Sequence, residues 1–279
     1  MTGKNIPGFS KEHFDIWAEI GKRFFEEVPS FSDIWNPSVE TDMKIGPYDI
    51  NPLGNLVGYI RSLRATCEQG LYAIRCLEGF STREASNITE FYVAHYLYDF
   101  IIRVKTGTDL LALIIKHIYG LGITNKQCSL ESGAFVSCLR STKSSFQTAE
   151  LLAREIDRTR NEWLGSFDTL RDLAVHRAGF KFMIVGDTEY PVHIELPLPE
   201  AVPKDQPIHY DSNDPLMALE PFIRDEPLVR FLAQIGSKSA SKYLITINPV
   251  RLCEEVWKLW SRSTENILSL CKEDLLAQF

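Results

Sequence analysis

Apolar residues recur every three or four positions through most of this chain, and that spacing constrains the fold more than any other feature. Between Ser144 and Arg177 the apolar and aromatic positions step by three, four or seven residues, so they line one face of a helix. We expect a single long helix there, ended by Gly179. The same spacing predicts further helices over residues 11–28, 52–79, 88–104, 109–119 and from 249 onward.

Other segments lack this spacing. Residues 30–51 are rich in Pro, Asn, Asp and Ser, which favours a loop. Thr106-Gly107-Thr108 predicts a break between two helices, and residues 121–143 are expected to be a loop or a short helix. The helix over 88–104 is apolar almost all round, which is typical of a buried central helix.

One part of the chain alternates like a strand. Residues Phe180–Val185 and Val192–Leu198 flank Gly186-Asp187-Thr188-Glu189-Tyr190, which predicts a β-hairpin. Residues 241–247 are a candidate third strand. We therefore expect an all-α helical bundle with a small β-hairpin insertion. Its predicted parts are a helical extension over residues 1–86 and a helical domain over 87–279 that carries the insertion near 180–198.

Charge and composition exclude several classes of function. The formal net charge is −7, which argues against a general coating of nucleic acid by charge alone. No run reaches the about 18 apolar residues of a membrane span, and the N-terminus has no apolar signal core. We therefore expect a cytoplasmic protein without a membrane partner. The six cysteines are scattered, which predicts reduced, mostly buried thiols and no zinc site. We expect neither a metal nor a cofactor.

One short motif at the end of the long predicted helix is a candidate for chemistry. Asp172 directly follows Arg171 and precedes His176 by one helical turn, so the carboxylate can orient the imidazole. A guanidinium can hold a phosphate with two hydrogen bonds, and a histidine can move protons near neutral pH. An Arg and a His at about this distance are expected roughly once by chance, so the spacing alone carries little weight.

With this motif at the end of a long helix and before a final helix, the segment resembles the HEPN superfamily (higher eukaryotes and prokaryotes nucleotide-binding domain). That family is known by an Arg, a polar residue directly after it and a His shortly beyond, here Arg171, Asp172 and His176. The resemblance extends as an architecture over residues 88–279. The Asp replaces the commoner Asn, which adds negative charge near a substrate phosphate.

The resemblance implies a metal-independent endoribonuclease. The ribose 2′-hydroxyl would attack the adjacent phosphate and leave a 2′,3′-cyclic phosphate. His176 would move protons, Arg171 would stabilise the phosphorane charge and Asp172 would position both. We assign substrate contacts to Arg177 and Arg103. Family members usually act as homodimers with a composite active site, in phage defence or as the toxin of a toxin–antitoxin pair, so RNA and an antitoxin or regulatory protein are the implied partners.

Two other interpretations stay open. The chain could be a catalytically silent HEPN-like module that binds a partner protein or a nucleotide, or a helical interaction protein outside that family. Cations in a last helical turn, here His176 and Arg177, also interact favourably with the helix carbonyls without any catalytic role. We interpret His95, Asp99 and Arg103 mainly as a buried polar network, with a substrate contact by Arg103 as the lesser option.

Overall fold

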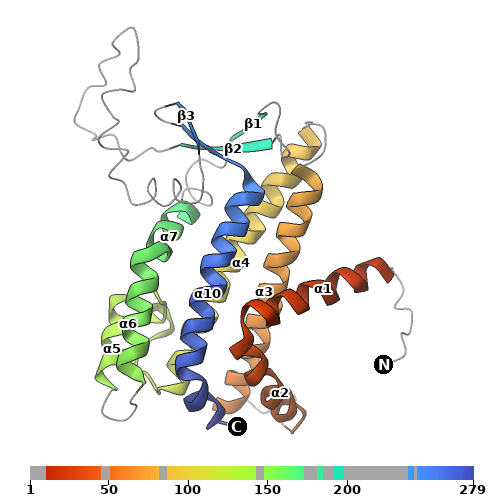
Figure 1. The fold of residues 1–279 in the computed structure, drawn as a ribbon. Helices are drawn as coiled ribbons and strands as arrows, with labels where there is room; N and C mark the ends of the chain where they lie inside the picture. Colours follow the sequence, from red (N-terminus) through yellow and green to blue (C-terminus); the bar gives the residue numbers. More distant parts are fainter. Residues whose placement is uncertain are drawn as a thin grey trace, which may run out of the picture. The chain divides into compact units, whose positions relative to one another are not determined.

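The computed structural model describes residues 11–44, 51–81, 87–142, 148–172, 181–184, 192–197, 238–241 and 244–279. Figure 1 labels its helices: α1 (Lys11–Glu27), α2 (Pro29–Lys44), α3 (Pro52–Ser81), α4 (Asn87–Ile118), α5 (Gly133–Ser141), α6 (Ala149–Thr159), α7 (Gly165–Asp172) and α10 (Pro249–Leu276). A short 3-10 helix, η1 (Asn125–Gln127), precedes α5, and a π-helix, η2 (Arg160–Leu164), joins α6 to α7. The expected all-α helical bundle is confirmed.

Four short strands form one antiparallel sheet. They are β1 (Lys181–Ile184), β2 (Val192–Pro197), β3 (Lys238–Ser241) and β4 (Leu244–Ile247), in the order β1-β2-β4-β3. Phe182 pairs with Ile194, and Ile194 pairs with Ile247 on its other side. Asn248 then caps α10, because its side-chain oxygen accepts a 2.9 Å hydrogen bond from the Arg251 amide. The central strand β4 therefore leads directly into the last helix.

The chain forms two compact units, and each is built from separate stretches of sequence. The described residues up to Tyr72, those of Arg103–Thr159 and those of Trp260–Phe279 make the first unit. The second consists of the described residues of Ala73–Ile102 and of Arg160–Leu259, including the sheet. The predicted boundary at residue 86 falls in a segment outside the described residues.

The loop expected over residues 30–51 is wrong for its first part, which is the helix α2. Phe31 and Ile34 are almost fully buried, and the Arg64 guanidinium of α3 lies 4.4 Å from the centre of the Trp35 ring. Glu265 of α10 accepts hydrogen bonds from the Ser30 amide at 2.8 Å and from its hydroxyl at 2.6 Å. These tertiary contacts outweigh the weak local helix propensity of the segment, which also contains Pro37.

The break expected at Thr106-Gly107-Thr108 is also wrong, since α4 is continuous from Asn87 to Ile118. A Cβ on Gly107 would lie 3.1 Å from Cζ2 of Trp260, so the glycine admits this ring against the helix. The Thr108 hydroxyl donates a 2.9 Å hydrogen bond to the Val104 carbonyl within the helix. Gly107 is therefore a packing residue and not a helix end.

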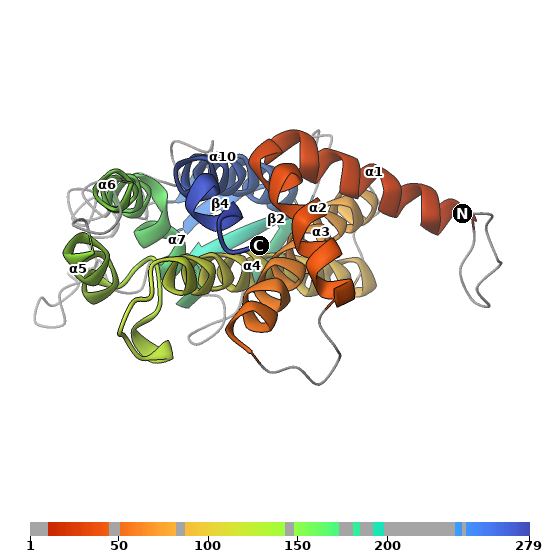
Figure 2. The same ribbon diagram turned by 90° about the horizontal axis from the view of Figure 1, so that it is seen from below.

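The long helix expected over residues 144–177 is confirmed as helix over Ala149–Asp172, but it is not a regular α-helix. The π-turn η2 interrupts it, with Trp163 and Leu164 buried in that turn. In the first unit α5 packs beside α6, as Figure 2 shows from below. The helix over 52–79 likewise continues past Gly79 to Ser81.

The first half of α4 is less buried than its apolar sequence predicts. Phe91 is 66% exposed, and Tyr92 and Ile102 are exposed as well. His95 is also exposed, so the interpretation of it as part of a buried network is wrong. An apolar residue on a helix surface is common, because proteins have too little polar surface to cover themselves completely.

Candidate functional site

The helix α7 carries Arg171, the central residue of the sequence motif. Phe167 and Leu170 are fully buried and fix one face of this helix, while Gly165 begins it directly after the π-turn. The Thr169 hydroxyl donates a 3.2 Å hydrogen bond to the Gly165 carbonyl. Arg171 follows Phe167 by one helical turn, so it lies in the last turn of a short helix, beside the face that is anchored in the core.

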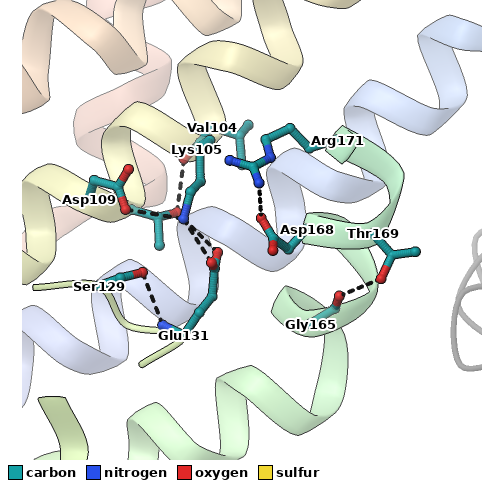
Figure 3. A network of polar contacts seen from close by, with 10 residues as sticks. Val104, Lys105, Asp109, Ser129, Glu131, Gly165, Asp168, Thr169 and Arg171 are labelled. Carbon is teal, nitrogen blue, oxygen red and sulfur yellow. Dashed lines mark hydrogen bonds and ion pairs between the residues drawn. The ribbon is translucent and has the colours of Figure 1, made fainter. Parts of the chain in front are cut away.

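The Arg171 guanidinium forms an ion pair with Asp168 one turn earlier, and their Nη2 and Oδ1 atoms are 2.9 Å apart (Figure 3). Both side chains are partly buried, with 26% and 30% of their surface exposed. The pair keeps the guanidinium oriented, and it also neutralises its charge at short range. A phosphate that approaches Arg171 must share it with Asp168 or displace that carboxylate.

The other residues of the motif lie at or beyond the edge of the described part. Asp172 is the last residue of α7, and its side chain is outside the description. His176 and Arg177 are outside the described residues altogether. The predicted contact between Asp172 and His176 therefore stays a prediction.

Arg103 lies on α4, in the first unit, whereas Arg171 lies in the second. Its side chain is half-buried. The assignment of Arg103 as a substrate contact stays a prediction.

A polar cluster that the sequence did not reveal surrounds Lys105 on α4 (Figure 3). Its ammonium donates to both carboxylate oxygens of Glu131, at 2.9 and 2.8 Å, and lies 3.2 Å from Asp109. Burial alone would lower the pKa of Lys105, but the hydrogen bond to Glu131 and the charge of Asp109 outweigh it and raise this pKa. The i, i+4 spacing of Lys105 and Asp109 indicates in the sequence that these two residues can pair. Glu131 is 26 residues away from Lys105, so the sequence does not indicate its contact.

A second cluster joins Tyr119, Thr148 and Asp274 in the first unit. The Tyr119 hydroxyl donates to Asp274 at 2.8 Å and lies 2.9 Å from the Thr148 hydroxyl, which also donates to Asp274. Burial raises the pKa of Tyr119, so the phenol stays protonated and serves as a hydrogen-bond donor. The cluster ties the end of α4 to the end of α10.

Among the described residues, no group of three or more His, Cys, Asp or Glu side chains is arranged so that it could hold a metal ion. None of the described helices combines the length and the apolar character needed to cross a membrane. Comparisons of this chain with family models, with curated proteins and with solved structures found no match.

Proposed function

We propose that this protein is a metal-independent endoribonuclease of the HEPN type. His176 moves protons, Arg171 stabilises the negative charge that develops on the phosphorane, and Asp172 positions them both. The product is an RNA end with a 2′,3′-cyclic phosphate. Arg177 and Arg103 are the proposed substrate contacts.

The observation that supports this proposal most is the placement of Arg171. It stands in the last turn of an anchored helix, and an acidic partner holds its guanidinium partly buried. A preoriented guanidinium loses less side-chain entropy when it binds a phosphate than a fully solvated one does. The motif continues directly from this turn toward His176.

The test is cleavage of a mixed RNA ladder in EDTA by the wild type, by His176→Ala and by Arg171→Lys. We expect fragments with cyclic phosphate ends from the wild type. Removal of a proton-transfer group typically costs about 10²–10⁴-fold in rate, so His176→Ala should be nearly inactive. Arg171→Lys keeps the charge but loses the bidentate geometry, so it should be slower than the wild type.

Arg154→Lys is the matched control, because Arg154 is an exposed arginine of α6 that pairs with Glu150. It should cleave like the wild type. Intact RNA after incubation with the folded wild type, or equal cleavage by His176→Ala, would contradict the proposed function.

The proposed cleft is composite, so the active form is a homodimer, with RNA as substrate and an antitoxin or regulatory protein as a further partner. Analytical ultracentrifugation at micromolar concentration tests the dimer. A protein that cleaves RNA as a monomer would disprove the composite site and leave the chemistry of the motif in place.

The Asp168–Arg171 pair favours one alternative, a catalytically silent HEPN-like module. If the carboxylate fully occupies the guanidinium, the motif cannot receive a phosphate. Asp168→Asn distinguishes the two functions. In an endoribonuclease this change removes a competitor for the phosphate and should lower KM for RNA, whereas in a silent module it should produce no cleavage.

A further inference from the structure

A cavity of about 280 Å³ lies in the first unit, between the first turns of α3 and the end of α4. Asn55 and Tyr59 line it from α3, Lys116 and His117 line it from α4, and Asn125 lines it from η1. It contains none of the motif residues. Polar side chains from three elements converge there around an open space.

The backbone fixes these side chains in place. Gly120 has a φ of +59° and turns the chain back after α4, so that the Leu121 amide donates to the Lys116 carbonyl at 3.0 Å. The Lys116 ammonium donates to the Asn125 side-chain oxygen at 2.7 Å. On the other side, the Asn51 side chain accepts a 2.7 Å hydrogen bond from the Gly54 amide and caps α3.

The polar groups around this cavity differ in how many of their hydrogen bonds are already used by described residues. Within the described part of the chain, the Asn55 amide, the Tyr59 hydroxyl and the His117 ring have no side-chain hydrogen-bond partner. The Lys116 ammonium has three donors, of which the bond to Asn125 uses one. Lys116 near the end of α4 is ordinary by itself, because cations interact favourably with the helix dipole there. The dipole of α4 does not explain why Tyr59 and Asn55 of α3 line the same cavity.

The charge of the lining selects the class of ligand. The described lining residues include Lys116 and no Asp or Glu, so they are net positive. Burial lowers the pKa of His117, and an anion beside the ring would raise it again. The carbonyls of Lys116 and His117 accept hydrogen bonds from Leu121 and Gly120, so these two oxygens are already paired and repel an anion less.

We propose that this cavity binds a small organic anion with one carboxylate or phosphate group and a short apolar part. Lys116, Tyr59 and His117 would hold the anionic group. The side chains of Leu113 and Leu121 would contact the apolar part. The volume is near the lower end of the range for small-molecule sites, so the ligand is smaller than a typical drug molecule.

The experiment uses three probes at constant ionic strength: butyrate, glycerol 3-phosphate and inorganic phosphate. Calorimetry gives Kd and thermal unfolding gives the melting temperature. For a probe at tenfold excess over Kd we expect a rise of about 2–4 °C in the wild type. Lys116→Gln should bind about tenfold more weakly or worse, because it loses a charged hydrogen bond. Tyr59→Phe should weaken binding less.

Lys126→Gln is the matched control, since Lys126 is an exposed lysine of η1 that does not line the cavity. It should bind like the wild type. Binding of butyrate alone assigns a carboxylate ligand, and binding of glycerol 3-phosphate with or without inorganic phosphate assigns a phosphate ligand. Either result supports the site if the Lys116→Gln variant no longer binds the same probe.

If the folded wild type binds none of the probes at about 10 mM, the proposal is overturned, because a Kd above that concentration is too weak for a specific site. Equal binding by Lys116→Gln would overturn it as well.

An NMR titration of the His117 ring gives a second readout. The other titratable groups that line the cavity are Lys116 and Tyr59, and a bound anion should raise the pKa of His117 in the wild type and not in Lys116→Gln. The result is independent of RNA cleavage, since His176→Ala should bind the probes unchanged.

Discussion

At the scale of single residues, position 107 shows how one absent methyl group decides a helix contact. The indole of Trp260 is 2% exposed and packs where a Cβ on residue 107 would stand. We predict that Gly107→Ala destabilises the protein. The alanine gains about 1 kcal/mol of helix propensity, but overpacking a core typically costs about 1–3 kcal/mol. Urea unfolding measures the difference.

The control for this prediction is Gly58→Ala in α3. A Cβ on Gly58 meets no atom within 4 Å, so the same substitution should stabilise the protein by about 0.5–1 kcal/mol. If both variants are stabilised alike, Trp260 does not restrict position 107.

Lys105 allows a prediction about pH. Its pKa is raised in the folded protein, above the ordinary value of about 10.4. Its contribution to stability is therefore fully present below about pH 10.4 and is lost as the pH rises through the raised value. We expect Lys105→Met to lower the free energy of unfolding by about 2 kcal/mol at pH 8 and by less at alkaline pH.

Unfolding of the wild type and of Lys105→Met at several pH values tests this. Lys22→Met is the control, because Lys22 is well exposed and pairs only with Glu26 at 3.6 Å among its described contacts. Such a pair contributes about 0–1 kcal/mol. A cost of Lys105→Met that grows between pH 8 and pH 11 would contradict the prediction.

At the scale of elements, α2 depends on a residue far away in the sequence. The Glu265 carboxylate accepts from the amide and the hydroxyl of Ser30, at the helix end where backbone N–H groups lack partners. We predict that Glu265→Ala lowers the free energy of unfolding by about 1–3 kcal/mol. Hydrogen exchange of the α2 amides should rise as well.

Glu273→Ala serves as the control on the same helix, since Glu273 is exposed. It should change stability by less than about 0.5 kcal/mol. Unchanged exchange of the α2 amides in Glu265→Ala would show that this helix is held by its apolar contacts alone.

Helices whose own apolar spacing is strong could be predicted from the sequence, whereas a helix that depends on distant residues, such as α2, could not. The helices α1 and α10 have strong apolar spacing of their own, and their predicted positions are confirmed. The helix α2 contains Pro37 and several turn-forming residues, and its burial of Phe31 and Ile34 depends on the rest of the unit. In α4 the glycine looked like a break because its partner, Trp260, is distant in the chain.

In the candidate site, too, local spacing predicts some features, and contacts between distant residues determine the others. The position of Arg171 on a helix could be predicted from Phe167 and Leu170, which lie on its buried face. Its ion pair with Asp168 was one of several pairs that the spacing allowed. The residues around the 280 Å³ cavity were not predicted, because they come from three elements and form no motif in sequence.

At the scale of the whole molecule, the six cysteines report on the packing of both units. Cys67, Cys253 and Cys271 are buried, and burial raises the pKa of each thiol. Burial also raises the pKa of Cys128, to about 11. Only Cys76 and Cys138 are half-buried. We predict that two thiols react rapidly with a thiol reagent at pH 8 in the native protein.

All six thiols should react after unfolding. Cys76→Ser and Cys138→Ser should each lower the number of fast thiols by one. Rapid reaction of more than two thiols in the native protein would show that the core around Cys128 or Cys271 opens more readily than its burial indicates.

The division of the first unit into three stretches has a consequence for biosynthesis. A ribosome delivers α1 and α2 first and α10 last, yet Ser30 of α2 needs Glu265 of α10. Until α10 emerges, α2 can contact α3 through Trp35 and Arg64, but Ser30 lacks its hydrogen bonds to Glu265. The first unit can therefore complete its packing only after the chain between Ser30 and Glu265 has been made, and we expect the yield in cells to depend on chaperones.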